Sequence, residues 1–163
     1  MEYDIKRNYY TNGNTEREIY RFNDQLHRTD GPAIIIYRTD GTIESEYYYT
    51  NNKRHRSDGP ATIIYRTDGT IEREYYYINN KVHRTDSPSI TYYNENGNIE
   101  REYWYLNNNV HRTNNPAITY YKKDGNTERE QYFKNDIDIT NTLLEAHYFE
   151  ADENTKELIW SMI

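Results

Sequence analysis

Residues 54–81, RHRSDGPATIIYRTDGTIEREYYYINNK, form the unit that this chain repeats. Residues 26–53 match the unit at all but five positions, and residues 82–109 and 110–137 follow at the same 28-residue step with more differences. A fixed period of this length is typical of arrays in which each unit packs against its neighbours. The repeat therefore predicts a modular scaffold and leaves the purpose of that scaffold open.

The two ends of the chain carry weaker copies of the unit. Residues 1–25 fit the repeat when they are shifted by 28 positions, which predicts an N-terminal capping hairpin. Residues 138–163 fit in the same way, since Trp160 falls 28 positions after Tyr132, and this predicts a divergent C-terminal capping hairpin. A helix over residues 143–149 is the alternative there. All 163 residues are thus expected to form a single repeat domain.

Composition argues against a compact globule. Only 34% of the residues are hydrophobic, the mean hydropathy is −1.23, and 20 residues are Tyr. Ordinary disorder is also disfavoured, because disordered chains are poor in aromatic and β-branched residues. A thin, elongated sheet of stacked units reconciles the two observations, since each unit needs to cover only its neighbours.

Charge and Cys content restrict the partners and the compartment. The net charge of −7 and the pI near 5.3 argue against nucleic acid or an anionic membrane surface as the main partner. No apolar run approaches the ~20 residues of a membrane span, and residues 1–10 lack the apolar core of a signal peptide. Without Cys, the chain has neither disulfides nor thiolate metal ligands. These features predict an intracellular protein that does not insert directly into a membrane.

The positions of Gly and Pro predict an all-β fold. Five Gly follow Asp or Asn between runs rich in β-branched and aromatic residues, which is a β-hairpin signal. A two-residue turn and a three-residue loop with a left-handed Gly both fit this signal. Side-chain alternation favours the three-residue loop at residues 39–41, because it places Tyr37 opposite Ile43 and Ile35 opposite Ser45. The expected fold is an elongated antiparallel meander of about six stacked hairpins, or twelve strands.

This loop also assigns side chains to the two faces of the sheet. One largely apolar face is expected to hold Ala33, Ile35, Tyr37, Ile43, Tyr47 and Tyr49. The other face is expected to hold Ile34, Ile36, Glu44, Glu46 and Tyr48.

The link between hairpins is predicted to be an ordered flap against the sheet. It runs from an Asn-Asn-Lys segment through His-Arg-Thr-Asp-Gly-Pro, and a loop of about ten residues is too long for a tight turn. Each Pro lacks an N–H group and is expected to open the next strand. Polar side chains should fix the flap by hydrogen bonds. These structural loop residues are His27, Arg28, Asp30, His55, Arg56, Asp58, His83, Arg84, Asp86, His111 and Arg112.

An aromatic column runs through the units. It consists of Tyr20, Tyr48, Tyr76, Trp104, Tyr132 and Trp160. The column could be a stacking platform for a sugar, a peptide or a flat ligand. It could also pack on itself and on the flaps, because a thin sheet has little else to bury, and this interpretation is favoured. A second column is interpreted as core: Tyr9, Tyr37, Tyr65, Tyr93, Tyr121 and Phe149.

Paired Glu residues form an acidic ladder, with Glu16 and Glu18 in the first unit and equivalent pairs in the next four. The i, i+2 spacing places both carboxylates on one face, as a glycosidase or a cation site requires. A mechanism needs one constellation rather than five copies, so a structural ladder of Glu with Arg28 and its equivalents is favoured. His27 and its equivalents should lie about 10 Å apart, too far to share a metal ion. No catalytic site, metal site or cofactor is therefore expected.

The order of these features resembles the divergent MORN-type repeats of giant viruses and some bacteria. Typical units of that family have a Tyr-rich strand, a Gly-containing turn and a following His-Gly-x-Gly segment. Tyr47–Tyr49 and His55 stand in that order here, and the resemblance covers nearly the whole chain. It implies an elongated antiparallel β array used for protein contacts.

The leading hypothesis is a non-enzymatic scaffold that mediates protein–protein interaction. The resemblance implies a viral structural or host-interaction protein of the host cytoplasm or the virion, and the abundance of Asn, Ile and Tyr suits the AT-rich genomes of many giant viruses. Its partners would be proteins, including another copy of this chain at the open strand edges. The alternative is a carbohydrate- or peptide-binding module that uses the aromatic column.

Overall fold

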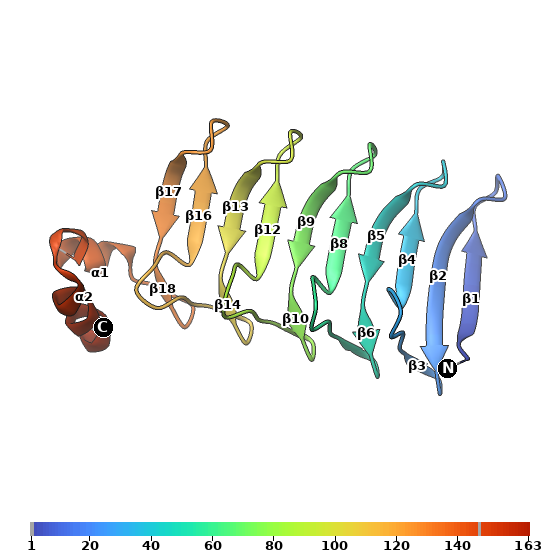
Figure 1. Cartoon of the computed structure of the whole chain (residues 1–163), viewed down its shortest axis with the longest axis horizontal. Coiled ribbons are helices and arrows are strands. Elements are labelled where there is room, and N and C mark those ends of the chain that lie inside the picture. The colour runs from blue at the N-terminus through green and yellow to red at the C-terminus, as the bar shows by residue number, and fades with distance from the viewer. Residues whose placement is uncertain (1, 147) are drawn as a thin grey trace.

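The computed structural model describes residues 2–146 and 148–163 and shows a ribbon of stacked hairpins followed by helices (Figure 1). The main sheet is antiparallel, has the strand order β1-β2-β4-β5-β8-β9-β12-β13-β16-β17, and includes β3 paired to β2. Its strands are β1 (Asp4–Tyr9), β2 (Thr15–Phe22), β3 (Gln25–Leu26), β4 (Ile34–Tyr37), β5 (Ile43–Tyr47), β8 (Thr62–Tyr65), β9 (Ile71–Tyr75), β12 (Ile90–Tyr93), β13 (Ile99–Tyr103), β16 (Ile118–Tyr121) and β17 (Thr127–Gln131).

The elongated antiparallel meander is confirmed, with ten strands along the path of the sheet instead of the expected twelve. We number its five long hairpins one to five along the chain: β1–β2, β4–β5, β8–β9, β12–β13 and β16–β17. Hairpin one lies where the N-terminal cap was expected.

The Asp-Gly turns form the three-residue loops that the sequence predicts. In hairpin two, the Gly41 N–H donates to the Arg38 carbonyl at 2.9 Å, and the Arg38 N–H donates to the Thr42 carbonyl at 2.8 Å. Gly41 has a φ of 89°, a value that residues other than Gly rarely adopt. Asp40 stabilises the turn, because its Oδ1 accepts both the N–H and the hydroxyl hydrogen of Thr42.

A further bulge corrects the face assignment. Tyr37 lies opposite Ile43 as expected, but Glu44 is an extra residue in β5, so Ile35 lies opposite Glu46 instead of Ser45. A one-residue slip moves the side chains beyond it to the other face. Ala33, Ile35, Tyr37 and Ile43 therefore share a face with Glu46 and Tyr48. The prediction that Tyr47 and Tyr49 lie on that face was wrong.

The first half of each predicted flap is a second, small hairpin. Asn51 and Asn52 have φ values of 49° and 61°, which identifies a two-residue turn of type I′. Asn adopts this left-handed conformation more easily than most residues. The small strands are β6 (Tyr49–Thr50), β7 (Lys53–Arg54), β10 (Tyr77–Ile78), β11 (Lys81–Val82), β14 (Tyr105–Leu106), β15 (Asn109–Val110), β18 (Phe133–Lys134) and β19 (Ile137–Asp138).

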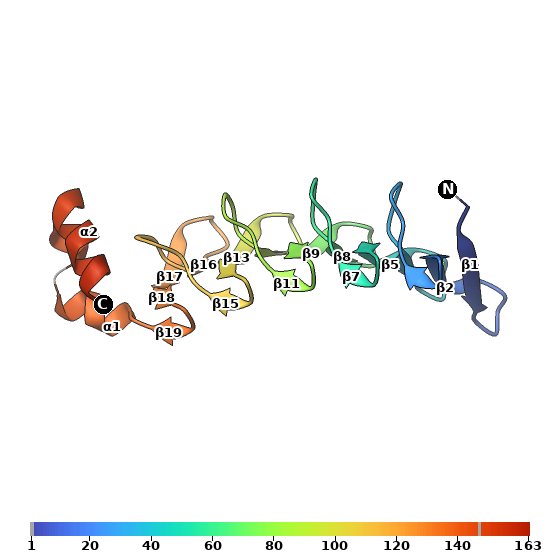
Figure 2. The same ribbon diagram turned by 90° about the horizontal axis from the view of Figure 1, so that it is seen from below.

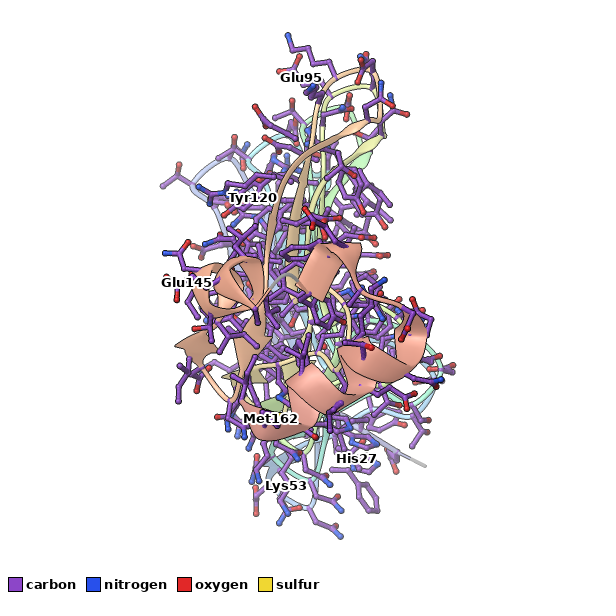
Figure 3. All side chains as sticks on the ribbon, turned by 90° about the vertical axis from the view of Figure 1, so that its left-hand side faces the viewer. His27, Lys53, Glu95, Tyr120, Glu145 and Met162 are labelled. Atoms are coloured by element: carbon purple, nitrogen blue, oxygen red, sulfur yellow. The ribbon has the colours of Figure 1, made fainter. Side chains whose placement is uncertain are left out.

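Each small hairpin is tied to the preceding unit by a pair of hydrogen bonds. Asn80 accepts the Arg54 N–H on its Oδ1 at 2.6 Å and donates its own N–H to the Arg54 carbonyl at 2.9 Å. The same pair of bonds joins Asn52 to Leu26, Asn108 to Val82 and Asp136 to Val110. The Gly turns lie along one long edge of the ribbon, where Figure 3 labels Glu95, and the small hairpins lie along the other, where it labels Lys53.

The C-terminal capping hairpin over residues 138–163 was a wrong prediction. The segment instead forms α1 (Thr140–Glu145), the 3-10 helix η1 (Tyr148–Glu150) and α2 (Glu153–Met162), and His147 lies outside the described residues. No Gly or Pro follows Gly125, so the turn residues that separate the strands of the other units are missing. Asp152 begins α2 by accepting the Thr155 N–H at 2.8 Å.

The only core cluster of large side chains lies under these helices, as far as the described residues show. It consists of Tyr132, Ile139, Leu143, Tyr148 and Trp160, with Ile159 and Ile163 packed against it. Within the sheet, small residues are fully buried instead: Ala33, Ala61, Ser89 and Ala117. The helices therefore end the array with a compact cluster of large apolar side chains.

Candidate functional site

The flaps stand on one side of the sheet, which we call the flap face. They consist of residues 27–33 and the equivalent residues of the next three units (Figure 2). Each flap places an Arg on a ring of the predicted aromatic column. The guanidinium carbon lies 3.9 Å from the ring centroid for Arg28 on Tyr20, 4.1 Å for Arg56 on Tyr48, 4.0 Å for Arg84 on Tyr76 and 3.6 Å for Arg112 on Trp104.

Three of these four arginines pair with Asp inside their own flap, which corrects the predicted Arg–Glu ladder. Arg56 Nε donates to Asp58 Oδ1 at 2.8 Å, and Arg28 and Arg84 bond to Asp30 and Asp86 in the same way. The Arg56 guanidinium lowers the pKa of the Asp58 carboxyl below its ordinary value. Each of these three guanidinium groups therefore contacts a ring and the carboxylate two residues further along the flap.

In four of the five Glu pairs of the ladder, the second Glu is bonded to a Tyr of the following unit. Tyr65 donates its hydroxyl to Glu46 at 3.0 Å, and the same bond joins Tyr37 to Glu18, Tyr93 to Glu74 and Tyr121 to Glu102. Burial raises the pKa of Tyr37 and Tyr121 to about 12, and the neighbouring Glu adds to the shift. These tyrosines belong to the second aromatic column, which was predicted to be core. Its first and last residues, Tyr9 and Phe149, are 59% and 41% exposed, so the column is not core at its ends.

The predicted aromatic column ends at Tyr132. Trp160 belongs to α2, where it is buried beside Tyr148, and it therefore does not continue the column. Tyr132 packs edge-on against Phe149, with the ring centroids 5.2 Å apart. In four of the remaining rings an Arg covers one surface, so a stacked ligand could use only the other surface. Binding by this column stays a prediction.

The histidines join neighbouring units. His55 Nδ1 accepts the Asn79 N–H at 3.3 Å, and His83 and His111 accept the equivalent N–H groups of Asn107 and Asn135. His27 Nδ1 lies 2.8 Å from Asn51 Oδ1. Among residues 2–146 and 148–163, no group of three or more His, Asp or Glu side chains converges as a metal site would require.

The opposite side of the sheet carries Tyr and Arg that sequence reasoning did not assign to a site. We call it the tyrosine–arginine face; it holds Tyr47, Tyr75, Tyr92, Tyr103, Tyr120, Arg73, Arg101 and Arg129. Neighbouring ring centroids are 6.3 Å apart for Tyr75 and Tyr92, 5.8 Å for Tyr92 and Tyr103, and 6.4 Å for Tyr103 and Tyr120. The rings therefore form one continuous aromatic surface across hairpins three to five.

Arginines lie over this aromatic surface as well. The Arg101 guanidinium is 4.0 Å from the Tyr92 ring centroid, and the Arg129 guanidinium is 4.6 Å from that of Tyr120. The five tyrosines are half-buried, so they are held in place and still reach solvent. The signal in the sequence was the Arg-Glu-Tyr segment at residues 73–75 and 101–103, but the bulge at Glu44 and its equivalents hid which face these residues share.

No protein-family model, no curated protein and no solved structure matches the chain. In the part of the chain that the structure describes, no helix is long and apolar enough to cross a membrane.

Proposed function

We propose that this protein is a non-enzymatic scaffold that binds a protein partner through its tyrosine–arginine face. The observation that carries the proposal is the unbroken run of half-exposed rings from Tyr75 to Tyr120, with Arg held over them. Tyr and Arg are enriched among the residues that contribute most to protein–protein binding. Their side chains are fixed by the sheet, so binding costs little conformational entropy.

The arrangement of the acidic residues supports a scaffold rather than an enzyme. Four of the five Glu in the column from Glu18 to Glu130 accept a hydroxyl hydrogen from the following unit, which makes them structural acceptors in equivalent positions. A catalytic carboxylate pair needs a single cleft around one bond of the substrate. The MORN-type kinship and the viral structural or host-interaction role predicted from the sequence belong to the same proposal.

The test is a capture experiment with matched variants. The full chain is immobilised, exposed to extract from its native source under cross-linking, and compared with the double variant Tyr92→Ile, Tyr120→Ile. Ile occupies the equivalent positions 36 and 64, so both substitutions suit the fold. Tyr9→Ile, which removes an exposed Tyr from the edge strand β1, is the control.

The proposal requires a protein that binds the wild type and Tyr9→Ile and is lost from the double variant. Equal capture by all three proteins would reject the tyrosine–arginine face as the binding surface. Retention of glycans instead of protein, with a change in Trp104 fluorescence, would favour the carbohydrate-binding alternative on the flap face.

A further inference from the structure

The second and third units depart from the repeat on the tyrosine–arginine face. Ser45 stands where the other hairpins have Arg17, Arg73, Arg101 and Arg129. Ile36 and Ile64 stand where hairpins four and five have Tyr92 and Tyr120. Arg54 replaces the aliphatic residue found at the equivalent positions Leu26, Val82 and Val110. The face therefore has short side chains at its centre between hairpins two and three, and a single additional cation beside them.

These substitutions create a groove of about 390 Å³. Ile64 and Thr62 lie at the positions where hairpins four and five carry Tyr and Ile. Arg54 comes from the small strand β7 and Arg73 from β9. The lining residues are Tyr47, Arg54, Thr62, Ile64, Arg73, Tyr75 and Tyr77. The groove thus has aromatic walls and two guanidinium groups, and no carboxylate belongs to its lining.

Arg54 is held in the groove by aromatic rings. Its guanidinium carbon lies 5.0 Å from the ring centroids of both Tyr47 and Tyr77, and its Nη2 donates to the Tyr49 hydroxyl at 3.1 Å. Among the described residues no carboxylate oxygen lies within 4.0 Å of this guanidinium, although the chain has a net charge of −7. An Arg without a carboxylate in so acidic a protein is suited to an external anion.

Two buried polar atoms of this groove lack a hydrogen-bond partner within the described chain. They are Arg54 Nε and the Thr62 hydroxyl oxygen. Buried polar atoms are nearly always bonded in proteins, so these two atoms add unmet hydrogen-bonding capacity beside the groove. Arg73, the second cation, is bonded to Glu72 at 2.8 Å and is about one-third exposed, so it can turn toward a bound anion.

We propose that this groove binds a carboxylate side chain of an extended acidic segment in a protein partner. The proposal rests on the protein-binding function proposed above and gives the partner its chemistry. The negative charge of the whole chain opposes long polyanions, which must approach many of its carboxylates at once. A short segment places one carboxylate against Arg54, and its aliphatic atoms lie against Tyr47, Tyr75 and Tyr77, which lie along the groove walls.

The experiment measures binding of a fluorescein-labelled peptide of five Glu-Ser repeats by fluorescence polarisation. In an extended peptide this alternation places all Glu side chains on one side. The matching peptide of five Gln-Ser repeats has the same shape without charge. The proteins are the full-length wild type, Arg54→Val and the control Arg17→Ser, which removes the same charge from an exposed residue of hairpin one, where Ser45 is the equivalent residue of hairpin two.

The expected result is preference of the wild type for the Glu peptide and a loss of about tenfold or more in affinity for Arg54→Val, with less than about twofold for Arg17→Ser. Thermal unfolding of Arg54→Val should match the wild type, because Val fills this position in the next two units. Equal losses in both variants would show non-specific charge attraction and overturn the proposal.

No binding of the Glu peptide at millimolar concentration, or equal binding of the Glu and Gln peptides, would also overturn it. Capture of a protein through Tyr92 and Tyr120 in the earlier experiment, together with either of these results, would leave the scaffold function standing and reject only the acidic partner segment.

Discussion

The bonds between Asn80 and Arg54 give a sharp prediction about what holds neighbouring units together. Asn80→Gly keeps the left-handed backbone, because Gly adopts the φ of 69° at this position without strain. It also keeps the bond from the Asn80 N–H to the Arg54 carbonyl. It removes only the side-chain oxygen that accepts the Arg54 N–H at 2.6 Å.

The expected loss follows from that single bond. Removing the acceptor of a backbone N–H costs about 1 kcal/mol in the free energy of unfolding. With a denaturant slope of about 2 kcal/mol per molar urea, the midpoint should fall by about 0.5 M. Asn80→Ala should lose about 1–2 kcal/mol more, because Ala in the left-handed region strains its Cβ against the next carbonyl.

Asn79→Gly is the matched control in the same turn. Asn79 also has a positive φ, of 50°, and its backbone N–H bonds to His55, but its side chain makes no hydrogen bond among the described residues. Its stability should stay within about 0.5 kcal/mol of the wild type. The assay is urea unfolding followed by circular dichroism, with amide exchange at Arg54 as a local readout. Equal shifts for Asn79→Gly and Asn80→Gly would refute the role given to the Asn80 side chain.

Two further predictions concern the Glu–Tyr ladder and the helical cap. The pKa of Tyr37 and of Tyr121 is about 12 in the folded state, above the ordinary 10.0. Their contribution to stability is therefore fully present below pH 10 and is lost as the pH rises to about 12. Urea midpoints measured from about pH 9 to 12 should fall over that window, and a constant midpoint would contradict this prediction. Leu143→Ala should destabilise the helical cap by about 3 kcal/mol, because Leu143 is fully buried. The expected result is a red shift of Trp160 fluorescence, with no change in the β-sheet signal in circular dichroism.

The backbone of the array could be predicted because its turn residues have few alternatives. Gly41 and its equivalents need a left-handed φ after Asp or Asn, and a fixed 28-residue step then places every long hairpin. The Asn51-Asn52 turn has a similar sequence signal, since Asn suits two consecutive left-handed residues. The predicted flap nevertheless includes this turn in one longer loop. Its Lys-Arg strand is too short to show an alternating pattern.

The faces of the sheet could not be predicted from alternation alone. A bulge at Glu44 adds one residue without leaving a Gly or Pro to mark it, and every assignment beyond the bulge then changes face. At the C-terminus, matched aromatic positions suggested another hairpin, whereas the absence of Gly and Pro after Gly125 was the informative feature. Aromatic residues suit sheet and helix cores alike, but a turn needs its own residue types.

These outcomes bear on where function resides in a repeat protein. Residues that recur in every unit, such as the Arg of the flap and the Glu bonded to Tyr, are accounted for by contacts that each unit needs to pack on the next. A residue that breaks the pattern has no such structural requirement. Arg54 breaks it with a half-buried cation in an acidic chain, and an external anion would offset the hydration that this guanidinium loses. Its Val equivalents show that the fold accepts the alternative, so a stability measurement on Arg54→Val separates a structural role from a binding role.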